Sequence, residues 1–428
     1  MSEWRELKLG ELVNRGLAET RTGPFGTQLH ASDYTEHGTP VINVRNLGFG
    51  DIRAAALERV GVDVQERLAQ HALVDGDVVF GRKGAVDRHA LVTKRESGWM
   101  QGSDCIRFRL LPGSPIVSQF LSKALLTHSH RAWMEAQCSH GSTMASLNQE
   151  IISRIVIRAP TNSTQLRIVS VLDAFDKVID INERRIALLE DLARALYQEW
   201  FVFFRFPGHE EVEFVDSELG PIPQAWEVRA LCEVASVNRR TLGVGDLPAS
   251  VRYLDISAVG VGQIGEPVVI PATSAPGRAR RELRDGDVVW ATVRPNRRAH
   301  GLVHDPSPDL IGSTGLAVLS PETVPSSFLF EYASDATFTE YLVSRATGSA
   351  YPAVRPSDFE RALLVIPDRA VMEAFDGAAD KSLRLASSLV RHNRALAATR
   401  DLLLPRLVTG RLDISDVNLG DLLRADAA

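Results

Sequence analysis

Two segments of the chain carry mostly apolar residues at alternating steps of four and three. The first ladder consists of Ile168, Leu172, Phe175, Ile179, Asn182, Ile186, Leu189, Ala193, Leu196 and Trp200. The second lies 207 residues later, position by position, and consists of Phe375, Ala379, Ser382, Ala386, Leu389, Asn393, Leu396, Arg400, Leu403 and Leu407. This spacing is typical of a coiled-coil seam. The first ladder predicts a helix over about 165–201, roughly 55 Å long at ~1.5 Å per residue.

The two predicted helices are the obvious partners of each other, because each has an apolar stripe that an isolated helix cannot bury. The connection between them passes through a whole intervening domain, which permits antiparallel packing. Asn182 and Asn393 both fall on the seam, where a buried amide commonly fixes register at a cost in stability; the alternative is that both are solvated. The second seam is the poorer one, since three of its positions hold Ser382, Ala386 and Arg400.

Outside these helices, short apolar runs predict β-strands. The runs are VINV, DVVF, IRFRLL, DVVWATV and GLAVL, and helices are expected after Pro115 and Pro325. This pattern favours an α/β or α+β domain with a small, irregular sheet, and it leaves the strand order open.

One stretch of seven residues occurs twice. Residues 73–79 read LVDGDVV and residues 283–289, 210 positions later, read LRDGDVV. Two Gly-Ser pairs, Gly102-Ser103 and Gly141-Ser142, also return at nearly the same offset, as Gly312-Ser313 and Gly348-Ser349. The alternative is that DGD marks the same tight turn twice by chance, because Asp and Gly dominate turns. A period this long exceeds that of a solenoid repeat, so we predict a tandem duplication of a whole domain.

The predicted order along the chain is domain, long helix, domain, long helix. The two domains are expected at 1–160 and 223–367, and the two helices at 161–205 and 368–410. The stretch between Arg205 and Trp226 is polar and acidic and holds three prolines. We interpret 206–222 as a linker and 411–428 as a C-terminal tail.

Composition places the chain among ordinary globular proteins. Of its 428 residues, 44% are hydrophobic and 24% charged. The three cysteines show neither CxxC spacing nor a disulfide framework, and the charged N-terminus lacks a signal peptide's apolar stretch, so we expect a cytoplasmic protein. The net charge of −6 argues mildly against bulk affinity for nucleic acid, although local patches set the field at a surface.

Catalytic motifs are missing from the sequence. An adenine methyltransferase should have an (N/D)PP(Y/F) tetrapeptide, and the nearest match, DPSP at 305–308, lacks the adjacent prolines and the aromatic residue. A P-loop is also absent. The repeated DGD could supply nuclease carboxylates, but a turn before a strand explains both copies, and the pair His128 and His130 is weak support for zinc. We therefore predict no catalytic residue, no metal site and no cofactor in this chain.

Basic and polar residues gather in loops of both domains. The candidates in the first domain are Arg21, Thr22, Phe25, Thr27, Gln28, Arg82, Lys83, Ser142 and Thr143. The candidates in the second domain are Arg294, Asn296, Arg297, Arg298, Ser349 and Tyr351. In DNA, Arg can bond guanine and Asn adenine with two hydrogen bonds, although phosphate contact is the commoner role. The alternative is a solvated surface loop. Replacing both Arg297 and Arg298 by Ala is expected to weaken specific binding.

Several of these segments, taken in order, resemble one protein family. They are GPFGTQL at 23–29, the two GDVV strands, GST at 141–143 and SVLDAFDKVIDINERRIALLEDLARALYQEWF. FPGHEEVEFVDSELGPIPQAWEV and LLLPRLVTGRLD extend the match toward the C-terminus. Over essentially its whole length, the chain resembles the specificity subunit of a type I DNA restriction-modification system.

The resemblance implies two target recognition domains, each of which reads one half of a split double-stranded DNA sequence. It implies that the long helices form an antiparallel coiled coil that spaces these domains and binds two methyltransferase subunits, joined by restriction subunits. S-adenosylmethionine, ATP and Mg are then expected in the partner subunits, with no catalysis and no membrane contact by this chain. The alternative class is a coiled-coil scaffold or interaction protein that does not bind DNA. Salt dependence separates the two, because binding to phosphates weakens steeply with salt.

Overall fold

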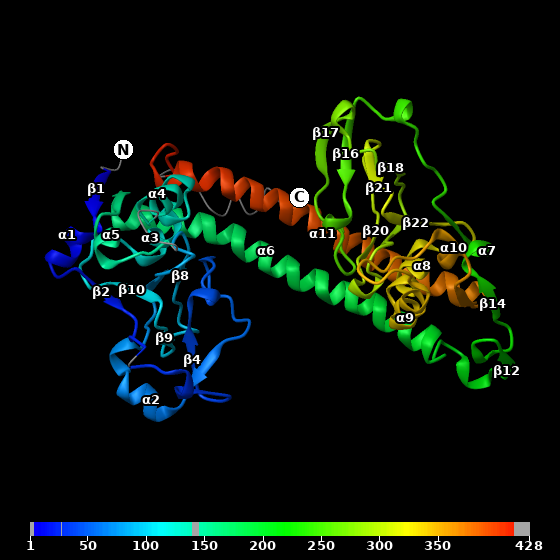
Figure 1. Cartoon of the computed structure of the whole chain (residues 1–428), viewed down its shortest axis with the longest axis horizontal. Coiled ribbons are helices and arrows are strands. Elements are labelled where there is room, and N and C mark those ends of the chain that lie inside the picture. The colour runs from blue at the N-terminus through cyan, green and yellow to red at the C-terminus, as the bar shows by residue number, and fades with distance from the viewer. Residues whose placement is uncertain (1–3, 27, 139–144, 415–428) are drawn as a thin grey trace. The chain divides into compact units, whose positions relative to one another are not determined.

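The computed structural model describes residues 4–26, 28–138 and 145–414. The chain divides into two compact units. Unit 1 comprises residues 1–179 and 394–428, and unit 2 comprises residues 180–393. Both divisions fall inside the long helices, so each unit holds a part of α6 (Asn162–Tyr197) and a part of α11 (Arg369–Val408) beside its own sheets (Figure 1).

Unit 1 contains three sheets. The largest has the order β2-β10-β7-β8-β5, with bounds Ala18–Thr22, Cys105–Leu110, Val78–Gly81, His89–Leu91 and Phe49–Gly50. The second has the order β3-β6-β4-β9, with bounds Tyr34–Thr35, Glu58–Val60, Thr39–Ile42 and Met100–Gln101. The third pairs β1 with β11, Arg5–Lys8 and Val156–Ala159. The short helices are α1 (Leu9–Asn14), α2 (Val62–Arg67), α3 (Ser118–Leu125), α4 (His128–Cys138) and α5 (Gln149–Ser153).

Unit 2 repeats this frame. One sheet has the order β15-β22-β19-β20, with bounds Ala235–Val237, Leu316–Pro321, Val288–Ala291 and His300–Leu302. Another has the order β17-β16-β21-β18, with bounds Val268–Pro271, Ser250–Leu254, Leu310–Ser313 and Ala279–Glu282. β14 pairs with β23, Glu227–Ala230 and Leu363–Ile366. The short helices are α7 (Leu231–Val234), α8 (Ser326–Ser334), α9 (Ala336–Arg345) and α10 (Pro356–Glu360).

The duplication of a whole domain is confirmed. The antiparallel order β2-β10-β7-β8 corresponds to β15-β22-β19-β20, and each second sheet contains a parallel pair, β4 with β9 and β16 with β21. In both units three short helices follow the sheet, and a late strand then pairs with an early one, β11 with β1 in unit 1 and β23 with β14 in unit 2. The fold is therefore a mixed α/β arrangement made twice.

The long helices run antiparallel within each unit. In unit 1, Ile168 and Leu172 share a buried core with Leu404 and Leu407, and Arg400 bonds Asp176 at 2.6 Å. In unit 2, Phe201 follows directly on α6, and its ring lies 4.9 Å from that of Phe375 near the start of α11. The amide nitrogen of Asn182 donates to the amide oxygen of Asn393 at 2.9 Å. The two helices therefore pair through their ladders in opposite directions.

Burial follows the ladders closely. The fully buried ladder residues are Ile168, Leu172, Asn182, Ile186, Ala193, Phe375, Ala379, Ser382, Ala386, Leu396 and Leu407. The partly buried ones are Phe175, Ile179, Leu189, Leu196, Trp200, Leu389, Asn393, Arg400 and Leu403. Ser382 and Ala386, two of the small residues of the poorer second seam, are buried like its larger members.

One expectation about the connecting segment needs correction. Residues 206–222, expected to be a linker, contain most of a β-hairpin of β12 (Phe214–Ser217) and β13 (Gly220–Pro223). Phe206, Ile222 and Trp226 are buried in the core of unit 2. The polar, proline-containing composition concealed these apolar anchors, because they are too far apart to form a run.

Candidate nucleic-acid interface

The two DGD sequences form the same turn at the start of the central strand of each unit. The Asp77 carboxylate accepts a hydrogen bond from the Val74 amide at 2.8 Å, and the Asp287 carboxylate accepts one from the Arg284 amide at 2.7 Å. The intervening glycines have φ of +91° and +84°, a region that favours glycine. The turn thus explains the repeated carboxylates. Among the described residues, no three His, Cys, Asp or Glu side chains are grouped to hold a metal ion.

In each unit the loop after that central strand lies against the segment before a short helix. In unit 1, Lys83 and Ser146 form a β-bridge, and the Leu147 amide donates to the Arg82 carbonyl at 2.7 Å. Unit 2 has the same arrangement, described by the bridge between Val293 and Ala353 and by the bond from the Arg294 amide to the Pro352 carbonyl at 2.7 Å. The structure therefore brings together two loops that the sequence separates by about sixty residues.

In unit 1 these loops also meet the glycine-bearing loop near the N-terminus. The Arg82 guanidinium lies over the Phe25 ring, 5.8 Å from its centroid, and the ring is 58% exposed. Lys83 instead forms an ion pair with Asp104 at 3.3 Å. Gln28 is exposed. Three candidates, Thr27, Ser142 and Thr143, lie outside the described residues.

Arg21 and Thr22 extend this surface along β2, together with two glutamines that the sequence analysis missed. Arg21 donates to the side chain of Gln70 at 3.2 Å, and Gln149 donates to the Thr22 hydroxyl at 3.0 Å. Gln149 also accepts a bond from the Thr20 hydroxyl at 3.2 Å. The glutamines lie 49 and 127 positions from their partners, so no local pattern could have found them.

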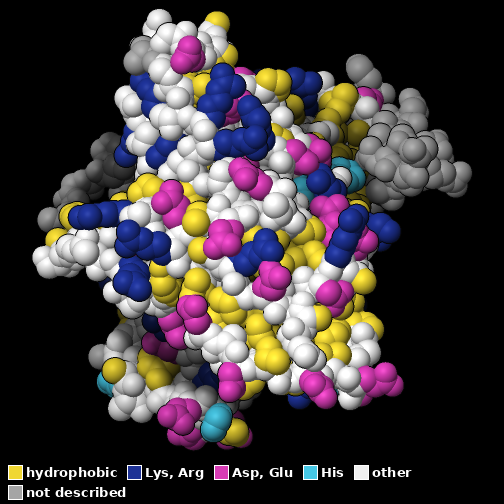
Figure 2. Space-filling view, turned by 90° about the vertical axis from the view of Figure 1, so that its right-hand side faces the viewer, with side chains coloured by type: hydrophobic (Ala, Val, Ile, Leu, Met, Phe, Trp, Pro, Cys, Tyr) yellow, Lys and Arg dark blue, Asp and Glu magenta, His cyan; other side chains and the backbone are white. Residues whose placement is uncertain are grey.

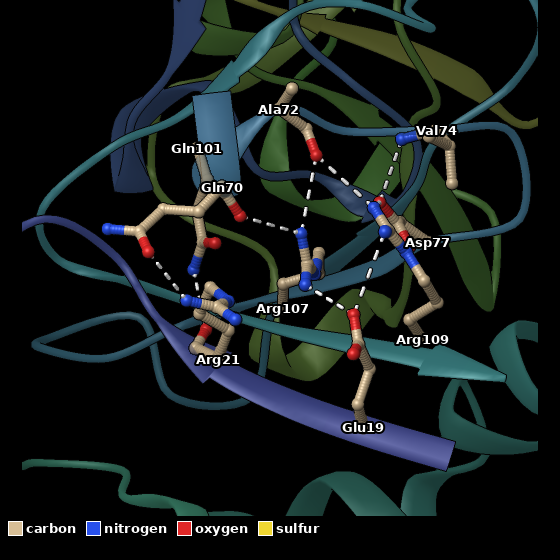
Figure 3. A network of polar contacts seen from close by, with 9 residues as sticks. All are labelled: Glu19, Arg21, Gln70, Ala72, Val74, Asp77, Gln101, Arg107 and Arg109. Atoms are coloured by element: carbon tan, nitrogen blue, oxygen red, sulfur yellow. Dashed lines mark hydrogen bonds and ion pairs between the residues drawn. The ribbon is translucent and has the colours of Figure 1, made fainter. Parts of the chain in front are cut away.

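A buried ionic network supports this part of unit 1 (Figure 3). The Arg107 side chain is 2% exposed, and it bonds the Glu19 carboxylate at 2.5 Å and the Gln70 and Ala72 carbonyls at 3.3 Å each. Arg109 holds both oxygens of the Asp77 carboxylate at 2.7 Å. Bidentate pairs of this kind fix geometry as well as adding energy.

The network reaches the candidate surface through backbone contacts. Arg107 stands directly opposite Arg21 in the β10–β2 pairing, and the Gln101 side chain donates to the Arg21 carbonyl at 2.9 Å. Burial lowers the pKa of Arg107, and the neighbouring Arg109 lowers it further; the bond to Asp77 raises the pKa of Arg109. The network therefore anchors the strand that carries Arg21.

In unit 2 the exposed aromatic residue comes from a different loop. Residues 347–353 form a tight hairpin closed by two backbone bonds of 2.9 Å between Thr347 and Ala353, and it carries Ser349 and Tyr351. The Tyr351 ring is 67% exposed, and the Arg294 guanidinium lies over it at 4.7 Å. Arg294 itself has φ +55°, which is uncommon for a residue other than glycine.

The other candidates of this cluster have different roles. Asn296 and Arg297 are exposed in the same loop. Arg298 donates to the Ser334 carbonyl at 2.6 Å, and its own carbonyl contacts the His300 ring at 2.7 Å. Arg298 therefore anchors the loop to α8. The double replacement of Arg297 and Arg298 would disturb the loop itself, so Arg297 alone is the better probe of binding.

Much of the remaining basic surface of unit 2 is neutralised. Figure 2 shows Lys and Arg side chains gathered in the upper part of the view, where β16 and β18 lie, with Asp and Glu among them. Three of the ion pairs there are Arg278–Asp255 at 2.8 Å, Arg240–Glu282 at 3.1 Å and Arg252–Asp309 at 3.4 Å. These pairs reduce the local field that a phosphate would meet.

No helix in the described part of the chain is long and apolar enough to cross a membrane.

Known proteins are similar to this chain in sequence and in fold. Residues 1–191 match the family model described as Type I restriction modification DNA specificity domain. The chain is 22% identical over 316 residues to the Type I restriction enzyme MjaIX specificity subunit of Methanocaldococcus jannaschii, with 72% of each chain covered.

A second relative from the same organism, the Type I restriction enzyme MjaVIII specificity subunit, is 22% identical over 287 residues, covering 65% of this chain and 67% of the relative. The fold is similar to that in the crystal structure of the type I restriction-modification S subunit from M. genitalium, with a TM-score of 0.63, 13% identity, and 95% and 96% of the two chains covered. Residues 1–191 therefore match a type I restriction modification DNA specificity domain, and the fold of the chain is similar to that of a type I restriction-modification S subunit.

Proposed function

We propose that this chain reads a split sequence on double-stranded DNA, with unit 1 reading one half and unit 2 the other. The observation that carries the proposal is the repeated meeting of two loops, at Lys83 and Ser146 in unit 1 and at Val293 and Ala353 in unit 2. The backbone frame is the same in both units, whereas the exposed side chains differ. Two different recognition surfaces on one frame suit a site whose halves differ in sequence.

The DNA-contacting residues that we propose are those at the meeting loops. In unit 1 they are Arg21, Thr22, Phe25, Gln28, Arg82 and Lys83, with Thr27, Ser142 and Thr143 in the same segments. In unit 2 they are Arg294, Asn296, Arg297, Arg298, Ser349 and Tyr351. The overall charge of −6 does not oppose this role, because binding depends on the charges that face the phosphates.

The long helices would bind the methyltransferase subunits. Ile181, Leu188 and Leu192 of α6 lie at steps of seven and four and are all exposed, with Leu188 at 70%. An exposed apolar stripe on a helix suits a protein partner. The partner proposed here is a methyltransferase subunit, of which the complex would hold two copies. Restriction subunits would join it through them.

Neighbouring residues on opposite faces of α6 provide a matched test of this docking surface. Leu188 is exposed, whereas Leu189 is partly buried on the seam. Leu188→Asp should leave the helix pair folded and weaken assembly at least tenfold, whereas Leu189→Asp should disrupt both. Sizing chromatography and circular dichroism of the coexpressed subunits measure the two effects. A complex of normal size with Leu188→Asp would remove this face from the docking surface.

The specificity subunit is itself non-catalytic. S-adenosylmethionine, ATP and Mg would therefore act in the methyltransferase and restriction subunits, in the cytoplasm where the DNA lies. A coiled-coil scaffold that binds only protein is the competing function. The match of residues 1–191 to a DNA specificity domain, and the repetition of the same frame in unit 2, disfavour it.

The decisive experiment is to coexpress this chain with its methyltransferase subunit in a host that lacks such methylation, and to map modified bases across the genome. Two short defined blocks separated by a fixed unspecified gap would support the proposal. An assembled complex that leaves no modified motif, and whose DNA affinity does not depend on salt, would favour the scaffold instead.

A further inference from the structure

Arg82 and Arg294 both have a guanidinium that lacks a hydrogen-bond acceptor within the described residues. Both side chains are partly buried, and within the described residues neither guanidinium makes a hydrogen bond or an ion pair. The basic residues beside them in sequence do have polar partners: Lys83 pairs with Asp104, and Arg298 donates to the Ser334 carbonyl. A partly desolvated guanidinium without acceptors is unfavourable unless a ligand supplies them.

Each of these arginines rests on an exposed aromatic ring. The Arg294 guanidinium lies 4.7 Å from the Tyr351 ring centroid, and the Arg82 guanidinium lies 5.8 Å from that of Phe25. Both distances lie within the ~6 Å range of a cation–π contact. The aromatic rings are themselves largely exposed, which leaves each arginine–ring pair open to a ligand.

The two rings come from segments that do not correspond. Tyr351 lies in the hairpin before α10, whereas Phe25 lies in the loop after β2. The segment of unit 1 that corresponds to the hairpin, GSTMAS at 141–146, contains no aromatic residue. Inheritance of one loop from a common ancestor therefore does not explain the pairing, which has been built twice from different parts of the domain.

The backbone at Arg294 holds the side chain in one direction. Its φ of +55° is rarely adopted by residues other than glycine, and such conformations cluster at functional sites. The Arg294 amide donates to the Pro352 carbonyl at 2.7 Å, so the arginine and the hairpin that carries Tyr351 are fixed to each other. The backbone therefore places Arg294 beside Tyr351, whose ring lies under the guanidinium.

The planar guanidinium fork presents two coplanar N–H donors, which fit the O6 and N7 acceptors of guanine in the major groove. The same fork also fits a phosphate, and the salt dependence of binding separates the two ligands. We infer that Arg294 reads a guanine in one half of the DNA site and Arg82 a guanine in the other. Tyr351 and Phe25 are positioning residues that hold the two guanidinium planes. This inference rests on the proposed function, and it assigns base readout to particular residues.

The test uses the complex of this chain with its methyltransferase subunit and a DNA library in which each pair of the mapped site is randomised. Arg294→Lys keeps the charge and removes the planar fork. It should reduce the preference for guanine at one pair of one half-site about tenfold or more, and leave the other half-site unchanged. Arg82→Lys should do the same in the other half-site. Arg205→Lys, at an arginine that lies over the Phe203 ring at 5.5 Å outside the meeting loops, is the matched control and should alter no preference.

The positioning role has its own variants. Tyr351→Ala should weaken the preference for guanine at the same base pair as Arg294→Lys, but by a smaller factor. Tyr351→Phe keeps the ring and should therefore keep the wild-type preference. In all of these variants the slope of log Kd against log salt should stay as in the wild type, because no phosphate contact is lost. Phe25→Ala and Phe25→Tyr form the corresponding pair in unit 1.

Three outcomes would overturn the inference. The first is a wild-type preference that Arg294→Lys and Arg82→Lys leave intact. The second is a uniform loss of affinity for all sequences on Arg294→Ala, with a salt slope reduced by about 1, which is the behaviour of a phosphate contact. The third is a mapped half-site that specifies no guanine. A wild-type complex without any base preference would instead overturn the proposed function, and with it this inference.

Discussion

The DGD turn has the same backbone in both units and different ionic partners. In unit 1 the buried Asp77 carboxylate accepts hydrogen bonds from Nε and Nη2 of Arg109, each at 2.7 Å. The strand β22 has Ser320 where β10 has Arg109, and the Ser320 hydroxyl donates to the buried Asp287 carboxylate at 2.6 Å. Burial raises the pKa of Asp287, and the bonds from the Ser320 hydroxyl and the Arg284 amide offset only part of this rise. The duplicated turn kept its backbone bonds, while the charges around it diverged.

A second matched position shows the same divergence. Ser118 and Ser326 both pack on the turn glycine, so Lys123 and Glu331, each five residues later, correspond. Lys123 bonds Asp173 at 3.1 Å and Asp176 at 2.6 Å on α6. Glu331 is buried, and burial raises its pKa to about 8; Arg194 lowers the pKa and Glu190 raises it. The matched position therefore holds an ion-paired lysine on α3 in unit 1 and a glutamic acid that is protonated at neutral pH on α8 in unit 2.

The largest expected effect is the loss of the Asp77 carboxylate. Asp77→Asn should destabilise unit 1 by about 3 to 5 kcal/mol, because it leaves the Arg109 charge without its partner. Asp287→Asn is the matched control, and it should change unit 2 by about 1 kcal/mol or less. Hydrogen exchange of the β7 and β19 amides reports on each unit separately. Equal losses in both units would show that the ionic partner does not matter.

Glu331→Gln should stabilise unit 2 at alkaline pH. The folded-state pKa of about 8 lies above the ordinary carboxyl value of 4.5, so ionisation opposes folding and unit 2 loses stability as pH rises from about 4.5 to 8. The variant should remove this loss, which is on the order of 4 kcal/mol above pH 8. Exchange of the α8 amides, compared at pH 4.5 and at pH 9, measures it. A gain of the same size at both pH values would contradict the assignment.

Lowering the pH should unfold both units, and unit 1 should unfold at a higher pH than unit 2. His89 and His300 are buried, and burial lowers the pKa of each to about 4, although bonds to Ser122 and to the Arg298 carbonyl partly oppose this. Each then contributes about 3 kcal/mol that is present above the unfolded pKa of ~6.5 and is lost as pH falls toward 4. In unit 2 the protonation of Glu331 and Asp287 offsets part of the loss.

The measurement for this prediction is the pH at which the amides of β8 and β20 lose protection from exchange. His89→Gln, which cannot be protonated, should shift the transition of unit 1 to lower pH and leave that of unit 2 in place. Simultaneous opening of both units, unaffected by the variant, would show that these histidines do not control acid stability.

The smallest expected effect concerns the helix pair. In unit 2 the helices meet through the neutral amides of Asn182 and Asn393, whereas in unit 1 they meet through the Asp176–Arg400 ion pair. Asn182→Leu should cost about 1 to 2 kcal/mol, because the amide oxygen of Asn393 loses the N–H donor of Asn182. The double Leu variant should recover that loss, as buried polar pairs often can be replaced by apolar ones. Thermal unfolding of the three variants gives the coupling energy, and additive losses would exclude the pairing.

Much of the fold could be predicted from local patterns. The ladders from Ile168 and Phe375 follow from the helical period, and the DGD turns follow from the backbone preference of glycine. The hairpin after Phe206 could not be predicted, because its apolar anchors lie far apart in a polar segment. The loops of the candidate site could be predicted from their basic residues. The sequence could not show that Arg298 anchors its loop while the Arg294 guanidinium, within the described residues, has no polar partner.

The sequence by itself determined the two-domain duplication, the paired helices and the strands that follow each turn, since these depend on spacing along one segment of backbone. The tertiary structure decided which side chains meet. Arg107 finds Glu19 across 88 positions, and Arg294 finds Tyr351 across the gap between two loops. His89 and His300 occupy matched strands, yet their serine partners, Ser122 and Ser334, come from different turns of the covering helix. Pairings of this kind depend on the distance and direction of side chains after folding, and no period along the chain encodes them.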